Sequence, residues 1–301
     1  MTPNVVEVRD LSRKFGTTQA LDNISLTVEP GLVYGLVGAN GQGKTTLIRH
    51  LMGLLSAETG SVRVFDMDPV RHPVNVLQRI GYLSEERELP SWMQIGELMR
   101  YTAAYHPNWQ RRYADELVAT FGLDTSKKIK DLSKGMRAQA GLIAAVAHKP
   151  DLLLLDEPST GLDAIVRKDI LNAIIRTVAD DGRTALFSSH LLDEVELMSD
   201  YVLMIDAGKL VLQGRLDEIR EQHHTLSVQF DSEIEALPGT AGVVSGERLG
   251  STWKLVCSDH DRVAASLQSS GAQITGTRQA SLQEIFVARV GRDRVPTETS
   301  A

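Results

Sequence analysis

Several features that mark other classes of protein are scarce in this 301-residue sequence. Cys257 is the only cysteine, so no disulfide can form within the chain and a reducing compartment is expected. The opening MTPNVVEVRD lacks the basic and apolar regions of a signal peptide. The longest apolar runs, at 142–147 and 152–155, are far too short to span a bilayer. A role at a membrane would therefore be served from the cytoplasmic side, through a partner.

Excess positive charge is also lacking. The chain carries 32 Lys and Arg against 39 Asp and Glu, which gives a formal net charge of −7. A general nucleic-acid binder usually presents a basic face, so no nucleic-acid partner is expected. The apolar content of 42% suits a globular protein, and the length suits one large domain and a small one.

Among the motifs that the sequence does contain, the glycine-rich stretch GANGQGKTT at 38–46 is the central one. An apolar run with strand character, 32–37, precedes it, and leucines at helical spacing follow it. Glycines let backbone N–H groups surround phosphate oxygens, a lysine offers a charge to them, and a hydroxyl suits Mg²⁺. The simpler alternative is a glycine-rich turn before an ordinary helix. The nine residues are Gly38, Ala39, Asn40, Gly41, Gln42, Gly43, Lys44, Thr45 and Thr46.

The rest of the chain alternates strand and helix patterns, which predicts an α/β fold with a parallel sheet. Short strands are expected at 5–8, 24–28, 62–65 and 80–83, and strands buried on both faces at 152–155 and 184–187. Helical spacing from 92 to 132, broken at Pro107 and Gly122, predicts a helical insert. Residues 207–209 read as a hairpin turn. Beyond a charged linker at 216–224, the order of elements suits a small ferredoxin-like domain.

Further polar residues stand where strands end and helices begin. Asp156 and Glu157 follow the leucine-rich strand and suit Mg²⁺ binding and activation of a water, although a charged turn is the alternative. Ser133 and Gly135 lie at an expected helix start, which suits a second anion site or a plain N-cap. His190 ends the next strand, at the edge where ligands bind in such folds, although a lone histidine is more often structural.

These motifs, in this order, resemble the ATP-binding cassette (ABC) ATPases over residues 4–220. Phe15, GANGQGKTT, IGYLSEE, LSKGM, LLLLDEP, STGLD and SSH carry the resemblance. It implies a P-loop NTPase cassette with a mainly parallel sheet core, an antiparallel N-terminal β part and a helical insert, plus a small α+β C-terminal domain. It also implies ATP and Mg²⁺ as ligands. The implied roles are adenine stacking for Phe15, phosphate and Mg²⁺ binding for Lys44, Thr45 and Asp156, catalysis for Glu157 and His190, contact with the partner's ATP for Ser133 and Gly135, and a dimer contact for Asp163.

Two positions depart from the common pattern. Glu85 stands where the family usually has a glutamine that contacts Mg²⁺ and the attacking water, and Met136 ends a signature that is more often LSGGQ. Both departures resemble exporters whose ATPase is a separate polypeptide. They leave the rate of hydrolysis and its coupling to transport open.

The resemblance implies the ATP-hydrolysing subunit of an ABC transporter, of the exporter kind, peripheral on the inner face of the cell membrane. Its implied partners are a separate membrane-spanning permease and a second ABC subunit, identical or not. Trp92 and Met93 are candidates to line the groove that receives the permease, with a place in the insert core as the alternative. The expected domains are a cassette at 1–220 with a helical subdomain near 90–140, an accessory domain at 221–291, and a disordered tail at 292–301. The accessory domain is expected to serve dimer contact or regulation, with an inert stabilising cap as the alternative. A regulatory, weakly hydrolysing cassette and a soluble non-transport ABC ATPase are the alternatives.

Overall fold

The computed structural model describes residues 3–230, 237 and 240–291. The chain divides into two compact units, 1–213 and 214–301, each with its own hydrophobic core. The charged segment expected as a linker forms helix α8 (Leu216–Gln222), which belongs to the second unit. The tail expected at 292–301 lies outside the described part of the chain.

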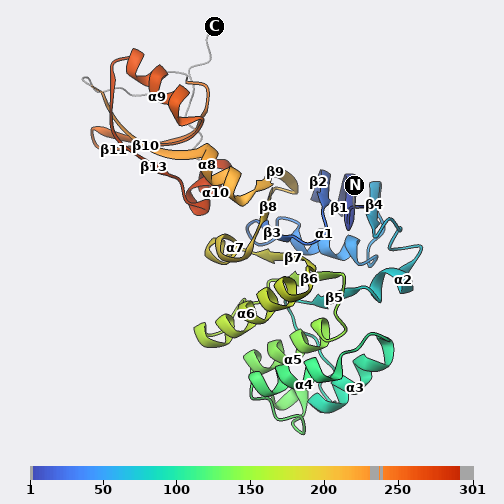
Figure 1. Ribbon diagram of the computed structural model, residues 1–301. Helices are drawn as coiled ribbons and strands as arrows, with labels where there is room; N and C mark the ends of the chain where they lie inside the picture. Colours follow the sequence, from blue (N-terminus) through green and yellow to red (C-terminus); the bar gives the residue numbers. More distant parts are fainter. Residues whose placement is uncertain (1–2, 231–236, 238–239, 292–301) are drawn as a thin grey trace. The chain divides into compact units, whose positions relative to one another are not determined.

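An antiparallel sheet of three strands, in the order β2-β1-β4, belongs to the first unit (Figure 1). Its strands are β1 (Val6–Phe15), β2 (Thr18–Val28) and β4 (Thr59–Val64). The predicted strand at 5–8 is therefore much too short. Asp10 has a φ of 50° and the pairing with β2 shifts register after Val8, so the alternation of buried side chains is interrupted although the strand continues.

The central sheet has six strands in the order β5-β6-β7-β3-β8-β9. The pairs β5–β6, β6–β7, β7–β3 and β3–β8 are all parallel, so the carboxyl ends of these strands share one edge. Every residue of β6 is buried, as the run of leucines predicts. The strands are β3 (Val33–Val37), β5 (Ile80–Leu83), β6 (Leu152–Asp156), β7 (Thr184–Ser189), β8 (Tyr201–Asp206) and β9 (Lys209–Arg215).

Helices of the first unit connect these strands and form the insert, in which α3, α4 and α5 lie side by side (Figure 1). The breaks predicted at Pro107 and Gly122 are confirmed, since α3 and α4 end just before them. Buried leucines and isoleucines of the central sheet, α1 and the antiparallel sheet share one core. The helices are α1 (Lys44–Leu51), α2 (Pro73–Leu77), α3 (Ile95–Tyr105), α4 (Arg111–Thr120), the 3₁₀ turn η1 (Ile129–Asp131), α5 (Lys134–Val146), α6 (Ala164–Asp181) and α7 (Leu192–Met198).

The turn between β8 and β9 is the predicted hairpin. Ala207 and Gly208 have φ angles of 46° and 75°, the left-handed pair that a two-residue hairpin requires. The Gly208 carbonyl accepts a hydrogen bond from the Asp22 N–H at 2.8 Å, which joins this hairpin to β2.

The second unit is an antiparallel sheet in the order β11-β12-β10-β13 with helices α9 and α10. This strand order is that of a split β-α-β arrangement, as expected for a ferredoxin-like domain. Trp253, Leu255 and Leu267 belong to its core. The elements are β10 (His223–Phe230), β11 (Val243–Leu249), β12 (Thr252–Ser258), α9 (His260–Ser269), β13 (Ala272–Gln279) and α10 (Leu282–Val290).

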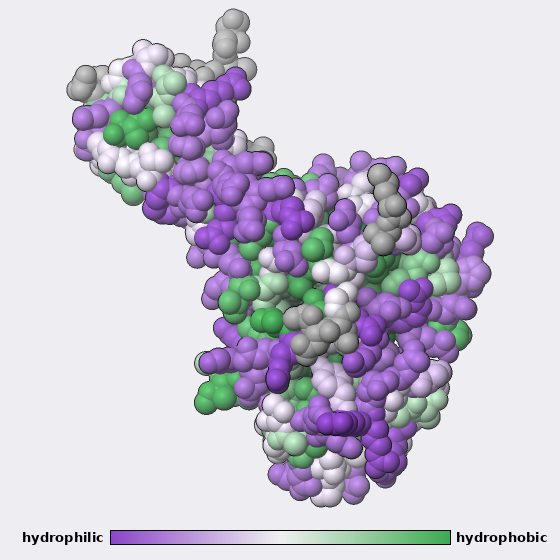
Figure 2. Space-filling view, in the orientation of Figure 1, coloured by the Kyte–Doolittle hydropathy of each residue, from purple (hydrophilic) through white to green (hydrophobic). Residues whose placement is uncertain are grey.

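Hydrophilic residues dominate the face drawn in Figure 2, with hydrophobic residues in small groups. Among the described residues, no helix is both long and apolar enough to cross a membrane.

Candidate active site

The phosphate loop predicted at 38–46 lies between β3 and α1. Its glycines are required by close backbone approaches: a Cβ on Gly43, where φ is 104°, would lie 2.3 Å from the Ala20 carbonyl oxygen, and one on Gly38 would lie 2.6 Å from that of Ile205. The side-chain oxygen of Gln42 accepts a hydrogen bond from the Ala207 N–H at 2.5 Å. The loop is therefore braced against the strands on either side of it.

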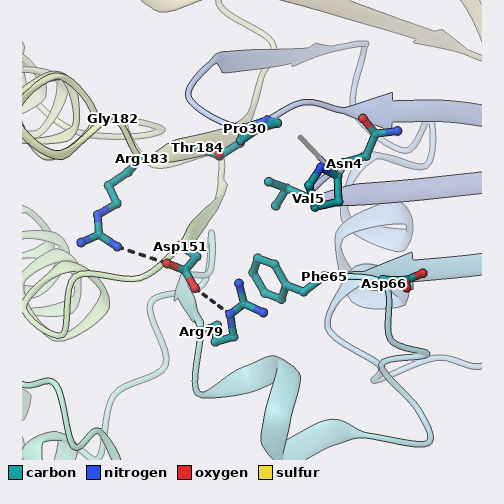
Figure 3. A pocket seen from close by; sticks show the side chains of 11 residues that line it. Asn4, Val5, Pro30, Phe65, Asp66, Arg79, Asp151, Gly182, Arg183 and Thr184 are labelled. Atoms are coloured by element: carbon teal, nitrogen blue, oxygen red, sulfur yellow. Dashed lines mark hydrogen bonds and ion pairs between the residues drawn. The ribbon is translucent and has the colours of Figure 1, made fainter. Parts of the chain in front are cut away.

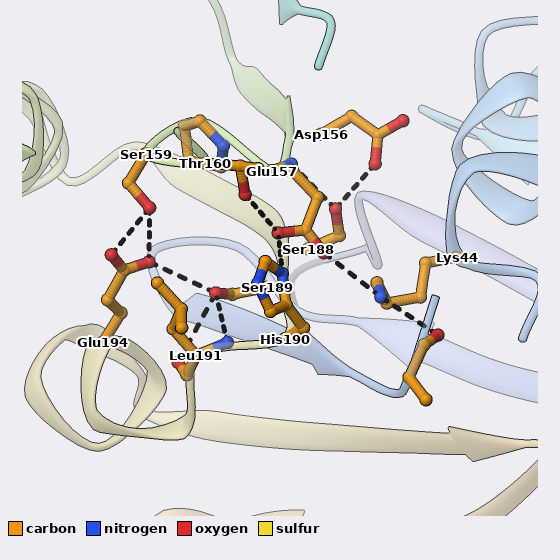
Figure 4. Close-up of polar contacts among 12 residues, drawn as sticks. Lys44, Asp156, Glu157, Ser159, Thr160, Ser188, Ser189, His190, Leu191 and Glu194 are labelled. Carbon is orange, nitrogen blue, oxygen red and sulfur yellow. Dashed lines mark hydrogen bonds and ion pairs between the residues drawn. The ribbon is translucent and has the colours of Figure 1, made fainter. Parts of the chain in front are cut away.

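Lys44, the first residue of α1, is buried at the carboxyl edge of the sheet. Its Nζ donates to the carbonyl oxygens of Gly38 at 2.6 Å and Ala39 at 3.3 Å. The same nitrogen lies 3.1 Å from Oε1 of Glu157, and both side chains are less than a tenth exposed (Figure 4). The sequence places these two residues in separate motifs, and the fold joins them in an ion pair.

Glu157 lies just after β6 with a φ of 49°, a left-handed conformation that non-glycine residues rarely adopt. Its Oε2 accepts hydrogen bonds from Thr160 Oγ1 at 2.8 Å and from His190 Nδ1 at 2.7 Å (Figure 4). Burial raises the pKa of Glu157, but the charge of Lys44 and the hydrogen bonds from Thr160, His190 and Lys44 outweigh it, so the pKa is lowered overall. The carboxylate is therefore ionised at neutral pH and held from three sides.

Asp156, the last residue of β6, is almost fully buried. Its Oδ1 accepts a hydrogen bond from Ser188 Oγ at 2.6 Å, and this hydroxyl in turn accepts from the Glu157 N–H at 3.0 Å. Ser188 thus ties the ends of β6 and β7 together, beside the two acids.

A cavity of about 400 Å³ gathers many of the predicted site residues. Glu85 lines it together with Lys44 and Glu157, so the position that replaces the family's glutamine faces the phosphate loop. Phe15 stands at this cavity, is 45% exposed, and has the Arg13 guanidinium 4.9 Å from the centre of its ring. The cavity is lined by Phe15, Thr18, Ala20, Asn40, Gly41, Gly43, Lys44, Thr45, Thr46, Glu85 and Glu157.

The three residues predicted to act across a dimer are not among those that line this cavity, and neither are five other predicted residues: Gly38, Ala39, Gln42, Asp156 and His190. Ser133 caps α5, because its Oγ accepts from the Met136 N–H at 3.1 Å, and Asp163 caps α6 by accepting from the N–H groups of Ile165 and Val166 at 3.0 Å. Gly135 is buried in α5, where a Cβ would lie 3.1 Å from the Val166 side chain. The N-cap alternative is therefore correct for Ser133 within one chain, and the role across a dimer stays a prediction.

Two polar groups that support the site were not found from the sequence. The Glu194 carboxylate is buried and accepts from Ser159 Oγ at 2.6 and 2.7 Å and from Ser189 Oγ at 3.2 Å, with Arg167 Nε at 3.4 Å (Figure 4). It joins the turns that follow β6 and β7. The second group is Arg87, whose guanidinium binds the turn after Glu157. Arg87 is a single basic residue within an acidic stretch, and this was the only feature of the sequence that could have pointed to it.

The candidate groove residues at the insert have different environments. Met93 is only 6% exposed, so its place is in the insert core and its assignment to the groove is wrong. Trp92 is 68% exposed, which leaves an indole available to a partner. The Met93 backbone is also tied to η1, because its carbonyl accepts from the Ile129 N–H at 2.8 Å.

The donors near the phosphate loop fit Mg²⁺. Thr45 supplies a hydroxyl and Asp156 a carboxylate, the hard oxygen ligands that Mg²⁺ takes. Among the described residues no group of three or more His, Cys, Asp or Glu could hold a metal ion. This pattern suits a cation bound by one or two protein oxygens together with phosphate oxygens, and not an all-protein cage.

A second cavity, of about 390 Å³, lies at the opposite edge of the sheet and is built differently (Figure 3). Asp151, just before β6, accepts from Arg79 Nε at 2.6 Å and from Arg183 Nη1 at 3.3 Å. The Arg79 guanidinium lies 3.8 Å from the centre of the Phe65 ring. Asp151 thus cross-links the segments that enter β5, β6 and β7.

Comparison with known proteins agrees with this geometry. A family described as "ABC transporter" matches residues 21–160. The chain is 32% identical to the uncharacterized ABC transporter ATP-binding protein YhaQ of Bacillus subtilis (strain 168), over 95% of this chain and 99% of that protein. It is 31% identical to the daunorubicin resistance ATP-binding protein DrrA3 of Streptomyces coeruleorubidus, over 98% of each.

Solved structures share the fold of the first unit. An ATP-binding subunit of an ABC transporter superposes with a TM-score of 0.66 at 27% identity, covering 72% of this chain and 92% of that one. A dimeric ATP-binding cassette in a post-hydrolysis state with ADP and Pi has a TM-score of 0.63 at 19% identity, covering 70% and 98%.

A phosphate loop, paired acids and a histidine at the carboxyl edge of one parallel sheet define a P-loop ATPase. The chain belongs to the ABC transporter ATP-binding proteins. It is an ATP-binding and ATP-hydrolysing subunit of a transporter.

Proposed function

We propose that this chain drives export as one of a pair of cassettes, docked on a separate membrane-spanning permease at the cytoplasmic face of the membrane. Names of two relatives support the direction: one is a daunorubicin resistance protein, and another, 31% identical, is the bacitracin transport ATP-binding protein BcrA of Bacillus licheniformis. A nucleic-acid partner is not proposed, because the chain has a net charge of −7.

In the proposed chemistry, Glu157 takes a proton from the water that attacks the γ-phosphate. One observation carries this role: the buried carboxylate is held by Lys44, Thr160 and His190 within hydrogen-bonding or ion-pairing distance. An ionised, oriented carboxylate meets the geometric demand on a general base. His190, at 2.7 Å from Oε2, orients the carboxylate and can also face the phosphate.

Binding of the triphosphate falls to the phosphate loop. Its backbone N–H groups and Lys44 would hold the phosphates, Phe15 would stack on the adenine, and Thr45 and Asp156 would hold Mg²⁺. When bound, the metal neutralises phosphate charge. Glu85 would face the attacking water in the place of the family's glutamine; its carboxylate accepts hydrogen bonds but donates none.

A second copy would complete each site through Ser133, Gly135 and Asp163. Both Ser133 and Asp163 cap helix N-termini, where backbone N–H groups and the helix dipole favour an anion. Neither residue lines the cavity at the phosphate loop of its own chain, which supports a role across a dimer.

Composite sites can be tested by mixing two inactive variants. Lys44→Met and Ser133→Arg are each expected to abolish ATPase activity. In a mixed dimer, one site then contains both lesions and the other contains neither, so an equal mixture should recover about a quarter of the wild-type rate. If each site belongs to one chain, mixing restores nothing, and that result would exclude the shared site.

The permease contact is assigned to Trp92. Trp92 is 68% exposed and lies in the segment that follows β5 and Glu85, and large exposed aromatic residues are typical of interfaces. Trp92→Ala should lower binding to permease-containing membranes while the soluble ATPase rate is retained. Equal loss of both would contradict this contact, and Tyr105→Ala, an exposed aromatic of α3, is the matched control.

A further inference from the structure

Arg87 lies in the segment that leads from the end of β5 into the insert, two residues after Glu85. It has a φ of 50° and is only 3% exposed. Its N–H lies 3.2 Å from the Ser84 carbonyl oxygen and 3.1 Å from the Ser84 hydroxyl, so the turn from 84 to 87 is closed by its own backbone. The side chain is therefore directed inward by a defined turn.

The guanidinium binds the turn that follows Glu157. Its Nη2 donates to the carbonyl oxygens of Pro158 at 3.1 Å and Thr160 at 2.9 Å, across more than seventy residues of sequence. The Thr160 hydroxyl donates to Glu157 Oε2 at 2.8 Å. Arg87 is thus separated from the Glu157 carboxylate by one residue.

The Arg87 hydrogen bonds stabilise a turn whose backbone is strained at Glu157. Glu157 has a φ of 49°, a conformation that persists only where its surroundings hold it. Arg87 holds the turn through its carbonyls, and Glu194 holds it through the Ser159 hydroxyl. Two buried charged groups therefore fix the three residues after the carboxylate.

A contribution to the stability of the fold does not explain why a guanidinium is buried at this position. Among the described residues, no carboxylate forms an ion pair with Arg87, and its Nε and Nη1 make no hydrogen bond. Burial lowers the pKa of Arg87, opposed by the charge of Glu85. Replacing buried charges by apolar groups of similar volume is often neutral or stabilising. The contribution of this side chain is better sought in the geometry of the turn.

We propose that Arg87 is a positioning residue for the Glu157 carboxylate and that it ties the Glu85 segment to the turn that carries this base. Glu85 and Glu157 line the same cavity, and Arg87 makes the bridge behind them. A displacement of the Glu85 segment is therefore transmitted to Pro158 and Thr160. The inference rests on the proposed role of Glu157 as the base.

The test compares Arg87→Met and Arg87→Lys with wild type in steady-state ATPase assays. Arg87→Met should lower kcat by roughly ten- to a hundredfold, because a small misplacement of a catalytic group has effects of this size, while KM for ATP changes less than about twofold. Arg87→Lys should recover part of kcat, since an ammonium can bind one of the two carbonyls. The thermal midpoint of Arg87→Met should stay near the wild-type value. Arg79→Met is the matched control, because it removes an arginine from the other end of the same strand.

A double-mutant cycle with Glu157→Gln separates positioning from general damage. Once the carboxylate is gone, Arg87→Met should lower kcat little further. The inference is overturned if Arg87→Met keeps wild-type kcat, if it raises KM alone, or if it lowers kcat by the same factor in both backgrounds. Thr160→Val, which removes only the hydroxyl contact, should show the same dependence on Glu157. Arg87→Lys, which keeps a cation at this place, is measured in the same cycle and covers the case that Arg87→Met does not fold.

The two proposals fail in different ways. If Glu157→Gln itself keeps the wild-type rate, the assignment of the base is wrong, and the role of Arg87 is refuted with it. If Glu157→Gln is inactive and Arg87→Met is fully active, only the inference about Arg87 is refuted.

Discussion

At the amino edge of the central sheet, Asp151 lies just before β6 beside two arginines. At the carboxyl edge, the same strand ends at Asp156, and Glu157, the next residue, contacts Lys44 and His190. The Asp151 side chain is 45% exposed and that of Glu157 is 4% exposed. Glu157 also has a positive φ, whereas Asp151 does not. The amino-edge cluster is therefore a solvated cross-link, and the carboxyl-edge cluster is a buried, strained group of the kind that carries function.

The largest expected difference between the edges is in catalysis. Glu157→Gln removes the proposed base and should lower kcat on the order of 10²- to 10⁴-fold. Asp151→Asn removes a carboxylate from the other end of the same strand and should leave kcat within about twofold of wild type. A phosphate-release assay at saturating ATP measures both. Similar losses in the two variants would remove the contrast between the edges.

The second largest difference between the edges is expected in the effect of replacing a glycine by alanine. Gly43→Ala adds a Cβ 2.3 Å from the Ala20 carbonyl oxygen, so the phosphate loop must shift and ATP binding should weaken at least about tenfold. Gly182→Ala, at the amino edge with a φ of 61° and open space around it, should cost only about 1 kcal/mol of stability. Calorimetric ATP titration and urea unfolding give the two quantities. Normal ATP affinity in Gly43→Ala would mean that the loop adapts.

A pH dependence of stability is expected near the amino edge. His148 stacks on His106 with ring centres 3.8 Å apart, and its Nε2 lies 3.1 Å from the Ile80 carbonyl oxygen. Burial, then the charge of His106 and, more weakly, that of Arg183 lower the pKa of His148 to about 4, against hydrogen bonds with the backbone of Ile80 and Ala144 that raise it. The unfolded chain takes up this proton near pH 6.5 and the folded chain only near pH 4, so stability should fall across that interval, by on the order of 2 kcal/mol.

Unfolding of His148→Phe measured from pH 7 to pH 4 checks this expectation. The variant should show a flatter decline than wild type, because phenylalanine keeps the stack but takes up no proton. His72→Phe, at an exposed histidine, should leave the slope unchanged. A wild-type slope in His148→Phe would assign the acid sensitivity to other groups.

The smallest effect should come from Arg79. Arg79→Met breaks a half-exposed ion pair, and Asp151 keeps Arg183, so stability should fall by about 1 kcal/mol or less and the loss should shrink in high salt. ATPase activity should not change. A clear loss of kcat would show that the amino edge communicates with the carboxyl edge.

Much of the site could be predicted from the sequence because its motifs are local. The phosphate loop needs several glycines within nine residues, and Asp156 and Glu157 stand at the end of the buried strand and directly after it. In a parallel sheet, residues that end neighbouring strands must meet, which also predicts that His190 lies near Glu157.

What the sequence did not reveal depends on contacts between distant segments. Arg87 reaches Pro158 across 71 residues and Glu194 reaches Ser159 across 35, and no spacing rule connects such pairs. The length of β1 was hidden for a different reason: a positive φ at Asp10 breaks the alternation that marks a strand. Met93 and Trp92 are adjacent in sequence, and only packing shows that one is buried and the other exposed.

The ion pair between Lys44 and Glu157 joins the lysine of the phosphate loop to the proposed base. The ammonium lies 3.1 Å from Oε1, while Thr160 and His190 donate to Oε2. If Lys44 binds the triphosphate as proposed, phosphate oxygens compete with Glu157 for its ammonium, so nucleotide binding should weaken the ion pair with the proposed base. Arrival of the substrate and release of this carboxylate would then be one exchange of partners.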